Sequence, residues 1–172
     1  NSKIIHNNHE IKVNRNAQLE TIKEAIHKHN HIVLHGEGGC GKTAIIKDLY
    51  EGIGLETAFC IRKAQSLNVL SLNDIFRFAN NYTATHFVSL FKDTEYKVFV
   101  IDSAERLQEI EDTTVLHNLI NVLIENKWSI VFTVRNNYLS DLCDELKELH
   151  SITFQCVPVD NISETDLSEY AI

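Results

Sequence analysis

The most informative stretch of this sequence is His31-Ile32-Val33-Leu34-His35-Gly36-Glu37-Gly38-Gly39-Cys40-Gly41-Lys42-Thr43. It joins a short apolar run, which predicts a β-strand, to a glycine-rich loop of the form GxxxxGKT and to a helix that begins at Lys42. This order of strand, loop and helix is the Walker A motif, a phosphate-binding loop. The glycines permit a tight turn whose backbone N–H groups face phosphate oxygens, and the helix adds its partial positive charge. The stretch therefore predicts a nucleotide-binding site.

The residues of this loop are expected to share the binding of the nucleotide. They are Gly36, Glu37, Gly38, Gly39, Cys40, Gly41, Lys42, Thr43 and Ala44. Lys42 is expected to reach the β- and γ-phosphates and so to take part in catalysis, and the Thr43 hydroxyl to ligate Mg²⁺. A glycine-rich connection without a binding role would not require Lys-Thr directly after Gly41.

Length and composition indicate one domain without a membrane span. The chain has 172 residues, of which 44% are hydrophobic and 23% charged, and this is enough for a single well-buried α/β domain. Its net charge of −8, with no dense cluster of the 16 Lys and Arg residues, gives no strong signal for nucleic-acid binding or an anionic membrane surface. The four cysteines form no CxxC pair, which favours reduced thiols in a cytoplasmic protein.

Periodicity predicts alternating strands and helices after a polar lead-in at residues 1–13 that holds one short extended piece. Besides the strand before the loop, strands are expected at 57–61, 98–101, 129–135 and, with one face exposed near a sheet edge, 152–156. Helices are expected at 17–29 with Asn16 as N-cap, after Lys42, at two patterns within 72–92, at 113–126, at 139–149 and after Ser163. This order predicts a three-layer α/β/α P-loop NTPase domain over residues 14–172, with a five-stranded, mainly parallel sheet.

Two acidic residues follow the apolar run Val98–Ile101. Asp102 lies at the end of this predicted strand, and the carboxyl ends of parallel strands meet at the ligand crevice, so we expect it to hold Mg²⁺ together with Thr43. The alternative is an Asp that caps the following turn. Glu105 lies on that turn and is the nearest acidic candidate for the catalytic base, although a Glu in the first turn of a helix is also favoured by the helix dipole.

Polar residues at two other positions are candidates for nucleotide contacts. Thr133 and Arg135 end the strand predicted at 129–135, where they could sense the γ-phosphate and neutralise its charge. Arg15 precedes the first helix and could contact the nucleotide. A surface Arg that leaves a strand and a plain Arg at a helix start are equally compatible with the sequence.

The motifs together resemble the NTPase core of STAND ATPases, the signal-transduction relatives of AAA+ proteins that include NACHT and NB-ARC proteins. The resemblance rests on Asn14-Arg15-Asn16, on the loop 36–43, on Val98–Glu105 with its Asp-Ser-Ala-Glu ending, and on Phe132-Thr133-Val134-Arg135, in that order. It spans about residues 11–170. It implies an ATP-driven switch that binds ATP or ADP with Mg²⁺, hydrolyses slowly, forms nucleotide-dependent homo-oligomers through neighbouring domains, and signals to an attached effector.

The same resemblance implies roles for individual residues. It places the second acidic residue of the Walker B region on Glu105 and the strand-end Thr-x-Arg on Thr133 and Arg135. It places a nucleotide-contacting Arg on Arg15, although Asn residues stand here where the family has Gly and Glu. It further implies that the segment after Pro158 leads toward a lid or winged-helix domain of the parent chain. Since the chain has no Met and its last helical pattern stops at residue 172, we interpret it as a fragment. Antiviral defence, in which many bacterial members act, is implied only by analogy.

Three other functions fit parts of the sequence. A small-molecule or nucleotide kinase also has a phosphate-binding loop but needs several lid arginines, and this chain has only Arg15, Arg62, Arg77, Arg106 and Arg135. A GTPase is disfavoured because Asn126-Lys127-Trp128-Ser129 lacks the Asp of the guanine-reading Asn-Lys-x-Asp signature. A non-hydrolysing nucleotide-binding scaffold remains open, although intact catalytic residues favour an Mg²⁺-dependent ATPase with low turnover in isolation.

Overall fold

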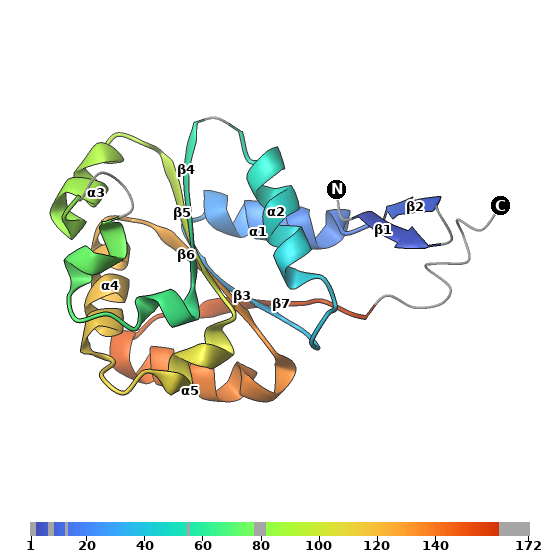
Figure 1. Cartoon of the computed structure of the whole chain (residues 1–172). Coiled ribbons are helices and arrows are strands. Elements are labelled where there is room, and N and C mark those ends of the chain that lie inside the picture. Colours follow the sequence, from blue (N-terminus) through green and yellow to red (C-terminus); the bar gives the residue numbers. More distant parts are fainter. Residues whose placement is uncertain (1–2, 7–8, 13, 55, 78–81, 162–172) are drawn as a thin grey trace.

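A five-stranded parallel sheet lies at the centre of the structure, with helices on both of its faces (Figure 1). The structure, a computed structural model, describes residues 3–6, 9–12, 14–54, 56–77 and 82–161. The strands lie in the spatial order β4 (Thr57–Lys63), β5 (Tyr96–Asp102), β6 (Ser129–Val134), β3 (His31–His35) and β7 (Phe154–Pro158). All neighbouring pairs run parallel. The α/β fold with five parallel strands is confirmed.

The central strands are buried on both faces, as their uninterrupted apolar runs predict. Along β5, Val98 and Val100 face one hydrophobic core while Phe99 and Ile101 face the other, because side chains alternate along a strand. The first core lies under α1 (Asn16–His27) and α2 (Lys42–Gly52). The sheet therefore separates two cores and fixes the helix that follows the glycine-rich loop against one of them.

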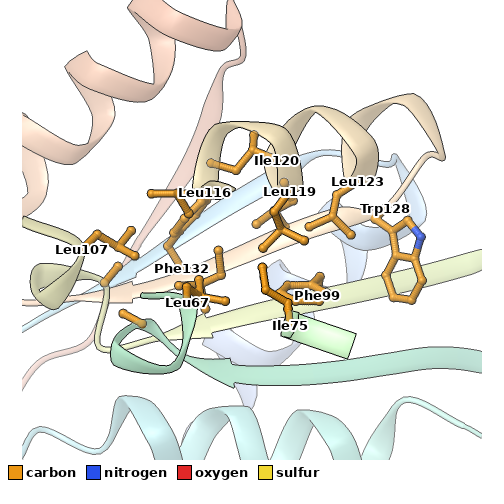
Figure 2. Packing of buried hydrophobic residues seen from close by; sticks show 14 of the residues in the cluster. Leu67, Ile75, Phe99, Leu107, Leu116, Leu119, Ile120, Leu123, Trp128 and Phe132 are labelled. Atoms are coloured by element: carbon orange, nitrogen blue, oxygen red, sulfur yellow. The ribbon is translucent and has the colours of Figure 1, made fainter. Parts of the chain in front are cut away.

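The second core lies on the opposite face of the sheet. The elements that cover it are η1 (Ala64–Leu67), η2 (Leu72–Phe76), α3 (Ala84–Leu90), η3 (Ala104–Glu109), α4 (Thr114–Glu125), η4 (Asn136–Tyr138) and α5 (Leu139–His150), where η denotes a 3₁₀ helix. Figure 2 shows how Leu119 and Leu123 of α4 point toward Phe99 of β5, with Trp128 at the end of the same row. None of the described helices is long and apolar enough to cross a lipid bilayer.

Two local predictions are wrong. Asn16 is the first residue of α1 and not its N-cap, and its N–H instead donates to Oδ1 of Asn14 at 3.1 Å. Of the first helical pattern within 72–92, the described residues Leu72–Phe76 form the short 3₁₀ helix η2, which begins with a capping box between Ser71 and Asp74, whereas Ala79 lies outside the described residues. The second pattern there forms α3.

Short strands lie near both ends of the described part of the chain. The lead-in holds two short strands rather than one, since β1 (Lys3–His6) pairs antiparallel with β2 (His9–Lys12). At the other end, β7 pairs with β3 alone among the described strands, which confirms the predicted edge strand, although it lies at Phe154–Pro158 rather than at 152–156. The helix predicted after Ser163 lies outside the described residues.

Candidate functional site

The carboxyl ends of β5 and β6 and the start of α2 surround a cavity of about 290 Å³. This size is near the lower end of ligand pockets, ~300 Å³, and suits a phosphate chain better than a whole nucleotide. The residues that line it are Gly38, Gly39, Gly41, Lys42, Thr43, Asp102, Ser103, Glu105, Thr133 and Arg135. All except Ser103 are predicted from the sequence as site residues. The parallel topology thus brings the glycine-rich loop, the carboxyl end of β5 and the carboxyl end of β6 together around one cavity.

The glycine-rich loop turns through conformations that favour glycine. Gly39 and Gly41 have φ angles of +84° and +100°, in the left-handed region. At Gly36 the constraint is space, because a Cβ there would lie 2.4 Å from the carbonyl oxygen of Val159 and 2.7 Å from the Cys40 sulfur. The first glycine of the motif therefore lets the loop pack directly on the chain that leaves β7.

Lys42 is held inside the loop by backbone carbonyl groups. Its ammonium donates to the carbonyl oxygens of Gly36 and Glu37, both at 2.8 Å, and lies 3.7 Å from the Cys40 sulfur. No carboxylate forms an ion pair with Lys42 in the described part of the chain. Its positive charge is therefore positioned but not neutralised, which suits the binding of an anion.

Asp102 is the centre of a hydrogen-bond network that links two strands to α2. The buried Thr133 hydroxyl donates to Asp102 Oδ1 at 2.6 Å, and the Thr43 hydroxyl donates to the same oxygen at 3.4 Å. Thr133 in turn accepts from the backbone N–H of Ser103 at 2.8 Å, and Ser103 has a φ angle of +61°. The sequence gives no signal for this role of Ser103, because it depends on the pairing of β5 with β6.

The oxygen atoms around Asp102 fit a magnesium ion. A carboxylate and a hydroxyl oxygen are hard ligands of the kind that Mg²⁺ prefers, and they lie at the start of α2 where phosphate oxygens would complete the coordination. Thr43 and Asp102 would therefore hold the ion.

Glu105 and Arg135, which both line the cavity, form an ion pair. Arg135 Nε lies 3.3 Å from Glu105 Oε1, and the Arg135 side chain is 57% exposed whereas that of Glu105 is 16% exposed. The second carboxylate oxygen of Glu105, Oε2, is buried and has no hydrogen-bond partner among the residues that the structure describes. A Cβ on Gly38 would lie 3.9 Å from the Arg135 guanidinium, so this side chain also lies beside the glycine-rich loop.

Arg15 does not line the cavity. Its buried guanidinium donates through Nη2 to the carbonyl oxygens of Cys40, at 3.0 Å, and Asp160, at 2.8 Å. These two hydrogen bonds join the glycine-rich loop to the segment after β7. A contact between Arg15 and a nucleotide stays a prediction.

A second network holds the outer side of the loop. Asn136, which follows β6, donates through Nδ2 to Glu37 Oε1 at 3.1 Å, and its Oδ1 lies 2.9 Å from His35 Nδ1. Because a carbonyl oxygen only accepts, His35 Nδ1 carries the hydrogen. Sequence reasoning missed Asn136 and His35, since their contact requires β3 and β6 to be neighbours. Ala44 lies in the first turn of α2 and, like Gly36, Glu37 and Cys40, does not line the cavity.

A larger groove of about 510 Å³ runs between α2 and β4 and shares Thr43 with the cavity. Its walls are mainly apolar, with Ile46, Tyr50 and Phe59 among them. It lacks the glycine backbone and the acidic residues of the cavity. The smaller cavity is therefore the candidate site for phosphate groups.

The chain is similar to a described family and to solved structures. The model of the family Novel STAND NTPase 3 matches residues 14–170. A comparison with curated protein sequences gave no match.

Several solved structures share the fold. The Walker-type ATPase PABY2304 of Pyrococcus abyssi has 11% identity and a TM-score of 0.68 over 92% of this chain. Hsp104 of S. cerevisiae, in an ADP complex, has 16% identity and a TM-score of 0.65 over 90% of this chain, and AMPPCP-bound DnaA of Aquifex aeolicus has 16% and 0.54 over 94%. The chain spans 56%, 23% and 52% of the lengths of these three proteins. At these identities the likeness shows the fold.

Proposed function

This chain belongs to the Novel STAND NTPase 3 family, and on that premise we propose that it binds and hydrolyses ATP as the switch domain of a larger protein. It is a nucleotide-binding NTPase domain of the STAND and AAA+ type. The observation that carries the proposal is the cavity in which Lys42, Thr43, Asp102 and Glu105 meet. A scaffold that had lost its chemistry would not need this combination of cation, metal ligands and base.

Binding of the phosphates rests on groups that are already in place. The glycine-rich loop and the start of α2 line the cavity, where the N-terminus of α2 adds partial positive charge and Lys42 adds a full charge. Mg²⁺ held by Thr43 and Asp102 would neutralise charge on the phosphate oxygens. Since the cavity has room for little more than a phosphate chain, the base and ribose would lie outside it.

Hydrolysis would use Glu105 as the base. The water oxygen attacks the γ-phosphorus while the bond from this phosphorus to the β–γ bridging oxygen breaks, and the water proton passes to the Glu105 carboxylate. ADP leaves with the bridging oxygen and its electron pair. Lys42 and Arg135 would stabilise the negative charge that is spread over the transferred phosphoryl group.

Calorimetric titration of ATP, ADP and GTP, with and without Mg²⁺, tests this function. We expect Mg²⁺-dependent binding of adenine nucleotides that Lys42→Ala abolishes. The matched control is Lys47→Ala, because Lys47 is an exposed lysine of the same helix that pairs with Glu51 and does not line the cavity. Absence of binding by the unmodified chain, or equal loss in both variants, would refute the proposed site.

Turnover is tested separately with Glu105→Gln, which removes the base but keeps the size of the side chain. Phosphate release by the chain should fall at least ~100-fold in this variant, the lower range for a general base. Equal rates in the variant and the unmodified chain would show that Glu105 is not the base.

The role in a larger protein rests on family membership rather than on the site. We infer other domains of the parent chain and a nucleotide-dependent homo-oligomer as partners, and a cytoplasmic location because the four cysteines are free thiols. Light scattering with and without Mg²⁺ and an ATP analogue tests the oligomer, and an unchanged mass in both conditions would contradict it for this chain.

A further inference from the structure

Two of the four cysteines lie beside each other, outside the candidate site. Cys143 belongs to α5 and Cys156 to β7, both are free thiols, and neither lines the cavity around Lys42. The Cys156 thiol is close enough to interact with the Cys143 thiol through both hydrogen bonding and charge. Two adjoining thiols from different elements are the starting arrangement for a disulfide bond.

The register of the sheet brings Cys156 to the face that α5 covers. Cys156 lies opposite Val33 of β3, and Val33 belongs to the core that α4 and α5 cover. Two residues earlier, Phe154 packs on the same core, and its ring centroid lies 5.7 Å from that of Phe132. Val157 instead belongs to the other core. Because side chains alternate along a strand, Cys156 points to the same side as Phe154.

The helix directs Cys143 to the same core. Leu139, Cys143 and Leu146 are four and three residues apart, so they share one side of α5. All three pack on the core to which Phe154 also contributes. The meeting of the two cysteines thus follows from helix periodicity on one side and strand alternation on the other.

We propose that Cys143 and Cys156 form a reversible disulfide, with a hydroperoxide as the oxidant, and that this bond fastens the edge strand β7 to α5. The inference is independent of nucleotide binding, since it assigns a modification site to a part of the fold that the proposed ATPase reaction does not use. In a reducing compartment the pair is a dithiol at rest, and the disulfides that form there are mostly transient or redox-sensing.

The two thiols differ in accessibility. Cys156 is exposed, so a dissolved peroxide reaches it first, whereas Cys143 is half-buried. Burial and, after it, the charge of Cys156 raise the pKa of Cys143 to about 11, so Cys143 stays a protonated thiol at neutral pH. An accessible cysteine beside a second, resolving cysteine is typical of a redox-sensitive pair.

The reaction takes two steps. First, the Cys156 thiolate attacks one oxygen of the hydroperoxide: an S–O bond forms, the O–O bond breaks, and the leaving oxygen takes up the proton that Cys156 released. Second, the Cys143 sulfur attacks the sulfur of the Cys156 sulfenic acid: the S–S bond forms, the S–O bond breaks, and hydroxide leaves with the Cys143 thiol proton as water. The two thiols together lose two electrons and two protons, which the hydroperoxide gains. Glutathione reverses the bond by thiol–disulfide exchange.

The other two cysteines are placed so that they cannot compete for this pairing. Cys60 lies in β4, at the opposite edge of the five-stranded sheet from β7. Cys40 packs in the core under α1 and α2, on the other face of the sheet. Both are buried, so a peroxide reaches them less readily than Cys156.

The disulfide would hold β7 from a second side. Among the described strands β7 pairs with β3 alone, and the chain that leaves it continues to Val159, whose N–H donates to the His35 carbonyl oxygen at 2.7 Å. A covalent bond to α5 closes a short loop over residues 144–155 and restricts local opening of this edge. Amide hydrogen exchange at Val159 is therefore expected to slow when the disulfide forms.

Peptide mapping of the unmodified chain tests the disulfide. The chain is treated with hydrogen peroxide, its remaining thiols are alkylated with N-ethylmaleimide after denaturation, and a non-reduced digest is analysed by mass spectrometry. We expect two of the four thiols to be lost, a linked peptide pair that contains Cys143 and Cys156, and full recovery of the thiols with glutathione. A chain that keeps four thiols, that links other cysteines, or that forms only dimers through Cys156 would overturn the inference.

Variants and hydrogen exchange complete the test. Cys143→Ser and Cys156→Ser should each abolish the intramolecular disulfide, whereas the matched control Cys60→Ser should form it as the unmodified chain does. An undiminished yield of this disulfide in either of the first two variants would contradict the assignment. Exchange at Val159 should slow on oxidation of the unmodified chain and not of Cys143→Ser, and equal rates in the oxidised and reduced unmodified chain would show that the bond does not fasten β7.

Discussion

Replacing Thr133 by Val tests the hydrogen-bond network on which the proposed metal site depends. Valine has nearly the shape of threonine and the same preference for β-strands, so the change removes a hydroxyl and little else. The hydroxyl donates to Asp102 at 2.6 Å and accepts from the Ser103 N–H at 2.8 Å, and Thr133 is 1% exposed. Water cannot easily replace these bonds at so buried a position.

The expected loss follows from the two bonds. One involves a carboxylate, worth ~1.5–3 kcal/mol, and the other is neutral, worth ~0.5–1.5 kcal/mol, so Thr133→Val should lower the free energy of unfolding by ~2–4.5 kcal/mol. Thr133→Ser keeps the hydroxyl and loses one buried methyl group, which should cost only ~1 kcal/mol. The difference between the two variants isolates the hydroxyl.

Urea unfolding followed by the fluorescence of Trp128 measures both values, because this single tryptophan is 1% exposed in the folded chain. Calorimetry with Mg²⁺ and ATP then shows whether Asp102 still supports nucleotide binding. If the Val variant is within ~0.5 kcal/mol of the Ser variant, the network does not stabilise the fold as its geometry implies.

Three further outcomes are expected. Gly36→Ala should lower the free energy of unfolding by ~1–3 kcal/mol and abolish nucleotide binding in calorimetry, because its Cβ would lie 2.4 Å from the Val159 carbonyl oxygen; unchanged affinity would contradict this close packing. Leu119→Ala, at a side chain with 0% exposure, should cost ~2–5 kcal/mol in urea unfolding, and a loss below ~1 kcal/mol would mean that the core relaxes around it. Acidification from about pH 7.5 to about pH 5.5 should lower the urea midpoint of unfolding. Burial lowers the pKa of His31 and of His150 below 6.5 in the folded chain, so the unfolded chain binds more protons in that range. A midpoint that rises on acidification would contradict this expectation.

The sequence predicts the fold because its strongest patterns are local. The strand, loop and helix around Lys42 follow from one motif, and β5 and β6 follow from apolar runs that only a doubly covered sheet can bury. The first of the two helical patterns within 72–92 is misleading, because a helical spacing of apolar residues also fits the short 3₁₀ helix η2 that packs on the core. Tertiary packing, not propensity, decides such short segments.

The partners of the site residues are harder to predict than the residues themselves. The topology puts Asp102, Glu105, Thr133 and Arg135 at one edge of the sheet, which a parallel α/β sequence already implies. The pairing of Arg135 with Glu105 depends on β5 lying directly beside β6, and no periodicity encodes that order.

The two hydrogen bonds of Arg15 have a mechanical consequence. The Arg15 guanidinium donates both to the Cys40 carbonyl oxygen in the glycine-rich loop and to the Asp160 carbonyl oxygen after β7. Asp160 lies 145 residues along the chain from Arg15. Val159 also presses against Gly36, and its N–H donates to the His35 carbonyl oxygen at 2.7 Å. A force on the chain near Asp160 would therefore be transmitted to the loop around Lys42 through the hydrogen bonds of Arg15 and the packing of Val159 on Gly36. Movement of the loop would displace the segment near Asp160 by the same route.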